Sequence, residues 1–79
     1  MRKFAIAIYD NFTCKNSIYI IEANGGVDAM VGAIIAHTRP EDRSEEFMLT
    51  WFDELRKMDI DGIKNALINC DQCIEIEKI

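Results

Sequence analysis

A hairpin followed by a helix is the feature that most constrains the fold of this chain. Residues 4–9 alternate large apolar side chains with small ones, the period of two that is typical of a strand with one buried face. Residues 17–23 form a second run, rich in isoleucine and tyrosine, which favour strands. Only a short polar loop separates the two runs, so they are predicted to pair as an antiparallel hairpin.

Three amphipathic segments follow a glycine pair at residues 25 and 26. Residues 27–37, 44–58 and 63–70 each place apolar side chains three or four positions apart, the spacing of a helix that buries one face. The middle segment has glutamates at its start and basic residues at its end, as the helix dipole favours. The last residues, 73–79, return to an alternating pattern and are predicted to form a third strand.

The order β-β-α-α-α-β predicts a two-layer α+β fold. A chain of 79 residues has material for one core, so residues 1–79 are expected to form a single domain. The third strand returns after three helices that cover one face, and it most simply pairs beside the first strand. The sequence therefore predicts a three-stranded antiparallel sheet in the order 2-1-3, with all helices on one face.

The other face of this sheet is expected to be bare and apolar. Its predicted residues are Ala5, Ala7, Tyr9, Tyr19 and Ile21. Monomers seldom expose an apolar patch of this kind, so the pattern predicts capture of a protein partner or association of the chain into a homo-oligomer.

Charge narrows the classes of partner. The net charge is −5, which repels a phosphate backbone and argues against direct binding of nucleic acid. The densest negative run is Glu41, Asp42, Glu45 and Glu46, which is read either as a solvated helix start or as a contact surface. Trp51 has the spacing of a core residue, and would be the first anchor to test in an interface if it were partly exposed.

Three cysteines and the only histidine raise the question of a metal. Cys70 and Cys73 have the spacing of two ligands of one tetrahedral ion. In the predicted topology Cys14 and His37 lie at the same end of the fold, so a zinc site with these four ligands is one hypothesis. The alternatives are plain free thiols, or a redox dithiol, which the helix-then-strand context disfavours.

The compartment is predicted from what the sequence lacks. No apolar run has the length that would cross a bilayer, and the first residues enter a strand in place of an apolar leader. Three cysteines cannot all pair within one chain and a reducing compartment disfavours disulfides, so the cysteines are expected to be thiols or ligands. A cytoplasmic protein with no membrane contact is therefore expected.

Part of the sequence resembles small orphan proteins of phages and mobile elements. Residues 3–8 and 18–23, with the helix that begins near Asp28, are similar to the opening of the DpnD/PcfM-like group. Residues 44–52 are faintly similar to a helix of a small type I anti-CRISPR protein. The resemblance implies an anti-defence inhibitor that binds and disables a host defence complex, or an oligomer that sequesters a nucleotide signal.

Three functions follow as hypotheses. The first is a non-catalytic inhibitor that covers the surface of a host protein, such as one that handles nucleic acid. The second is an oligomer that sequesters a small nucleotide, with pockets between subunits because one subunit is too small to enclose a ligand. The third is a structural module stapled by zinc. An enzyme is the poorest candidate, because one histidine and no motif do not assemble a nucleophile, a base and an orienting group.

Overall fold

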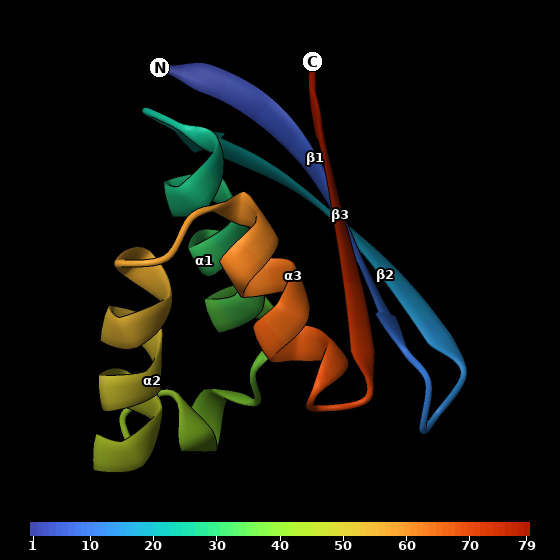
Figure 1. Ribbon diagram of the computed structural model, residues 1–79, viewed down its shortest axis with the longest axis vertical. Coiled ribbons are helices and arrows are strands. Elements are labelled where there is room, and N and C mark those ends of the chain that lie inside the picture. Colours follow the sequence, from blue (N-terminus) through green and yellow to red (C-terminus); the bar gives the residue numbers. More distant parts are fainter.

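The computed structural model describes residues 1–79 and confirms the predicted order of elements. The elements are β1 (Arg2–Asp10), β2 (Lys15–Ala23), α1 (Gly26–His37), the short 3₁₀ helix η1 (Pro40–Asp42), α2 (Glu46–Arg56), α3 (Ile60–Ile68) and β3 (Gln72–Lys78). The strands form one antiparallel sheet in the order β2-β1-β3, as predicted. Figure 1 shows every helix on one side of this sheet, with α1 and α3 next to the strands and α2 farther out against α1.

Two turns at one end of the sheet hold the strands in register. Asp10 accepts hydrogen bonds through Oδ1 from the backbone N–H groups of Phe12 and Thr13, at 2.9 and 3.3 Å, which closes the hairpin loop. The backbone N–H of Asn11 donates to the carbonyl of Asp71 at 2.9 Å and ties this loop to the turn before β3. The end of the sheet that carries both turns is therefore one connected unit.

Local signals explain where the helices begin and end. Asp59 caps α3 by accepting a hydrogen bond from the backbone N–H of Gly62 at 2.7 Å, so the helix starts at Ile60, earlier than its apolar spacing predicts. The end of α1 is held by Arg43. Its guanidinium donates to the carbonyls of Ile35, Ala36 and Thr38, each at 2.9 Å.

The core lies between the helices and the inner face of the sheet. All 14 buried residues are hydrophobic and form one cluster, with Ile6, Met30, Leu55, Ile63 and Leu67 among the largest side chains fully inside it. No buried polar side-chain atom lacks a hydrogen-bond partner. None of the helices has the length and apolar character that spanning a bilayer requires.

Candidate functional site

The outer face of the sheet, turned away from the helices, is the candidate site. Directly paired residues of neighbouring strands share a face, so the pairing assigns its members. Ala5 pairs with Ile20 on one side and Glu77 on the other, and Ala7 pairs with Ile18 and Glu75. Along the face, therefore, small residues in the central strand lie between isoleucines on β2 and glutamates on β3.

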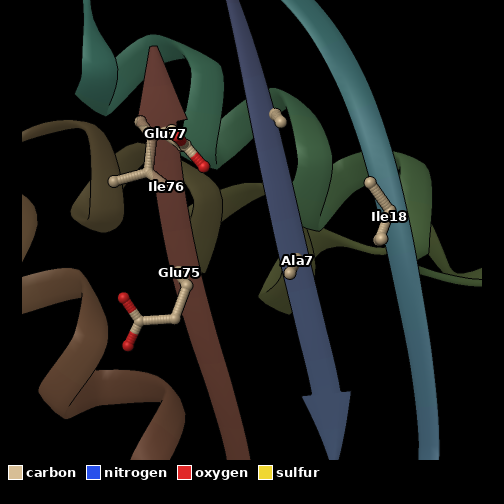
Figure 2. Close-up of a pocket in the computed structure, with 6 residues that line it drawn as sticks. Ala7, Ile18, Glu75, Ile76 and Glu77 are labelled. Atoms are coloured by element: carbon tan, nitrogen blue, oxygen red, sulfur yellow. The ribbon is translucent and has the colours of Figure 1, made fainter. Parts of the chain in front are cut away.

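This arrangement makes a hollow. Ile18 is 67% exposed and Ile20 is 59% exposed, so both stand out from the sheet on the β2 side. A cavity of about 380 Å³ lies over the two alanines, bordered by Ile18 and by residues 75–77 of β3. Figure 2 shows Ala7 on the central strand, between Ile18 on one neighbouring strand and Glu75 on the other. The face offers a recess for an apolar group from outside the chain.

Some of the carboxylates on this face have an ion-pair partner within the chain, and one does not. Glu75 accepts from Lys64 of α3, with Nζ and Oε2 3.2 Å apart, and its carboxylate points away from Ala7 in Figure 2. At the other end of the face, Lys3 and Glu22 pair across the strands at 3.8 Å. Glu77 takes part in no ion pair of the structure and lines the hollow, so it is the free negative charge there.

Two of the residues predicted for the outer face belong to the inner face. Tyr19 pairs with Ile6 and Ile21 pairs with Phe4, both of which point into the core. Tyr19 and Ile21 are accordingly partly buried and packed against the core cluster. The prediction of their face was wrong, because β2 is apolar on both faces and the loop alone decides which set turns inward.

The remaining outer-face prediction is confirmed in position. Tyr9 pairs with Cys73 and Asn16, lies on the same face as the two alanines, and is 39% exposed. The sequence reasoning missed Ile18 and Ile20, although their exposure is higher. The register of the hairpin, in which Asp10 pairs with Lys15 across a loop of four residues, decides that Ile18 and Ile20 face outward. Apolar spacing alone does not reveal this register.

The predicted acidic surface before α2 is partly neutralised from within the chain. Arg39 donates from Nε to Asp42 at 2.9 Å and lies 3.7 Å from Glu41. The hydrogen bond that Arg39 donates to Asp42, together with the charges of Asp42 and Glu41, raises the pKa of Arg39 above its ordinary value. Glu45 and Glu46 remain exposed and unpaired. This surface is less negative than the sequence alone indicates.

Hydrophobic exposure on α2 differs from expectation. Trp51 is half-buried, packs against the core cluster and has its ring centroid 6.1 Å from that of Phe52. Phe47 stands out instead, 68% exposed beside Glu45 and Glu46. The start of α2 therefore presents a single aromatic side chain among carboxylates, which is a smaller apolar surface than the outer face of the sheet.

The four residues of the predicted zinc site are not gathered together. Cys14 and Cys73 both contact Asn11, with their sulfur atoms 3.8 Å from its carbonyl oxygen and 3.9 Å from its Nδ2, respectively. His37 instead shares a hydrogen bond with Tyr19. No three side chains of the histidine, cysteine and acidic types form a group that could hold a metal ion. The structure shows Cys14, Cys70 and Cys73 as exposed free thiols, and zinc binding stays a prediction.

A second cavity lies between the end of α1, α2 and the end of the sheet. Its volume is about 300 Å³, and its lining includes His37, Arg39, Asp42, Trp51 and Gln72. Most of its polar groups already have partners, since Asp42 bonds Arg39 and Nδ1 of His37 bonds Tyr19. The cavity combines an aromatic ring with a cation but leaves few polar atoms free for a ligand.

No protein-family model matches the chain, and neither a curated protein nor a solved structure is similar to it. The resemblance to phage and mobile-element proteins thus rests on the sequence pattern alone.

Proposed function

We propose that this chain is a non-catalytic binding protein that covers the surface of a protein partner with the outer face of its sheet. The observation that carries the proposal is the exposure of Ile18 and Ile20 beside a hollow floored by Ala5 and Ala7. Exposure of two large aliphatic side chains to water on a bare sheet face is unfavourable. A partner that covers them lowers the free energy by about 25 cal/mol per Å² of apolar surface buried.

The sequence resemblance gives this binding a context. A small acidic cytoplasmic protein of phage or mobile-element type would act as an anti-defence inhibitor by occluding a host defence complex or a protein that handles nucleic acid. With a net charge of −5, such a protein would approach the basic surface that a nucleic acid normally occupies faster than it would approach an acidic one.

Affinity purification from a host lysate tests the proposal. The tagged chain is compared with an Ile18→Asp/Ile20→Asp double variant and with a Leu49→Asp control, which places a single aspartate at an exposed leucine of α2. The wild-type chain and the control should retain a stoichiometric partner that the double variant loses. Repeated recovery of the chain alone, or equal capture by all three proteins, would argue against the proposal.

A second candidate function is sequestration of a nucleotide signal. The cavity of about 300 Å³ favours it, because Trp51 could stack on a base there, and a phosphate would compete with Asp42 for Arg39. Thermal unfolding in the presence of a nucleotide panel separates the two functions. A true ligand at a hundredfold excess over its Kd stabilises a protein by about 2.7 kcal/mol, whereas a protein-binding module would show no shift with any nucleotide.

A further inference from the structure

We infer that the occupant of the outer face is an amphipathic helix of another protein, with a large apolar side chain in the hollow over Ala5 and Ala7 and a lysine or arginine beside Glu77. This inference rests on the proposed function and names the chemistry of its partner.

The shape of the face matches one helix. Neighbouring strands lie about 4.8 Å apart, so the side chains of β2 and β3 stand about 10 Å apart across the central strand. An α-helix with its side chains is about 10–12 Å wide. Because alanines floor the central strand, a helix lying along the face can insert one row of its side chains between the isoleucines of β2 and the glutamates of β3. Figure 2 shows the position of this row, over Ala7 and between Ile18 and Glu75.

The two sides of the hollow select different side chains. The β2 side is formed by the exposed Ile18 and Ile20, which favour an apolar stripe with residues at helical spacing. The β3 side carries Glu77 without an ion-pair partner, while Glu75 is already held by Lys64 at 3.2 Å. A basic residue of the partner helix that borders its apolar stripe would therefore lie beside Glu77, and an acidic residue at the same position would be repelled.

A second copy of this chain is a poor occupant of the same face. When two sheets stack with aligned strands, a two-fold axis between them sets β3 either against β3 or against β2. The first arrangement brings the glutamate-bearing strands of both copies together, and the second places Glu77 over Ile20, because both residues are level with Ala5. Each arrangement buries an uncompensated carboxylate, which is costly in an apolar interface.

Selection from a displayed library of 18-residue helical peptides tests the inference. The chain is the target, and an Ala7→Ile variant, which fills the hollow from an outward-facing position, serves for counter-selection. Enriched peptides should carry apolar residues at i, i+3 or i+4 and i+7, with lysine or arginine next to them. The inference would be overturned if the enriched peptides were acidic or lacked helical spacing. It would also be overturned if no peptide bound the chain better than it bound the Ala7→Ile variant.

Calorimetry with the most enriched peptide then locates the contact. Affinity should fall about tenfold or more for Ala7→Ile, since a loss of 1.4 kcal/mol in binding is a factor of ten. It should fall about two- to fivefold for Glu77→Gln, the range of an exposed ion pair, and stay unchanged for Glu54→Gln on α2. Equal affinity for all variants would contradict the inference. An Ile18→Ser variant provides a second test of the hollow if Ala7→Ile fails to fold.

Two further measurements exclude other occupants. Native mass spectrometry that shows a dimer of the chain, lost in Ala7→Ile, would assign the face to a second copy and overturn the inference. Binding of the chain to vesicles of phosphatidylcholine and phosphatidylglycerol through Ile18 would assign it to a lipid surface, with the same consequence. Loss of the lysate partner in the Ile18→Asp/Ile20→Asp variant, without any helical peptide selected, would leave the proposed function standing and refute only the helix.

Discussion

The phenolic oxygen of Tyr19 lies 2.8 Å from Nδ1 of His37, and this hydrogen bond joins the edge strand β2 to the last turn of α1. Their rings meet edge to face, with centroids 5.9 Å apart and planes at 87°. β2 has only one neighbour in the sheet, so a side-chain link to the helix layer helps to hold it.

Removing the Tyr19 hydroxyl is expected to weaken the fold. A partly buried hydrogen bond contributes about 0.5–1.5 kcal/mol, so Tyr19→Phe should lower the free energy of unfolding by about that amount. Urea denaturation followed by circular dichroism measures the change. Tyr9→Phe is the matched control, since Tyr9 makes no side-chain hydrogen bond and faces the other side of the sheet. Equal effects of the two variants would show that the Tyr19 bond contributes nothing.

Arg43 is expected to be the most important cation for stability. Its guanidinium satisfies three carbonyl oxygens at the end of α1, which a lysine cannot reach together. Arg43→Lys should cost about 1–3 kcal/mol of unfolding free energy, because hydrogen bonds to a charged group are worth about that range. Arg56→Lys is the control, because Arg56 makes only an exposed pair with Asp53 at 2.7 Å. A lysine tolerated equally at both positions would refute this role of Arg43.

Cys14 has a backbone conformation that favours glycine. Its φ is 57°, in the left-handed region, where a residue with a β-carbon is disfavoured by about 1–2 kcal/mol. Glycine loses some of that gain to the entropy of the unfolded chain, so Cys14→Gly should raise the unfolding free energy by up to about 1 kcal/mol. Cys70→Gly, at a residue outside this region, should lower it. A thermal unfolding midpoint that falls for Cys14→Gly would contradict this prediction.

The sequence predicts the order of elements because each one has a local signal: alternation in β1, helical spacing in α1 to α3, and an N-cap at Asp59. It also predicts that β3 lies beside β1. The face of β2 is not predicted, because residues 18–21 are apolar without interruption and either set suits the core. The sequence therefore predicts the correct face of the sheet for the site, but it assigns Tyr19 and Ile21 to that face in place of Ile18 and Ile20.

The position of α2 depends on two of its side chains. Leu55 and Phe52 are buried, whereas Leu49 on the same helix is 50% exposed. Leu55→Ala should cost about 2–5 kcal/mol, the range for large-to-small changes in a packed core, while Leu49→Ala should cost far less. Guanidinium denaturation of the two variants measures the difference. Similar costs at both positions would mean that α2 does not pack on α1 as Figure 1 shows.

Consecutive isoleucines on β2 are expected to respond very differently to the same charged substitution. Ile20 and Ile21 are neighbours of the same type, but Ile20 faces outward beside Ala5, and Ile21 packs against the core opposite Phe4. Ile21→Asp places a carboxylate against the core and should lower the unfolding free energy by several kcal/mol, because an unpaired charge there loses its hydration.

Ile20→Asp keeps its charge in water and should cost only about 1 kcal/mol, the span of strand propensity. It should nevertheless abolish capture of the protein partner, because it removes apolar surface where the partner docks. Denaturation midpoints and partner capture, measured on both variants, check the two effects separately. If Ile20→Asp unfolded the chain while Ile21→Asp did not, the pairing of β1 with β2 and the site built on it would both be wrong.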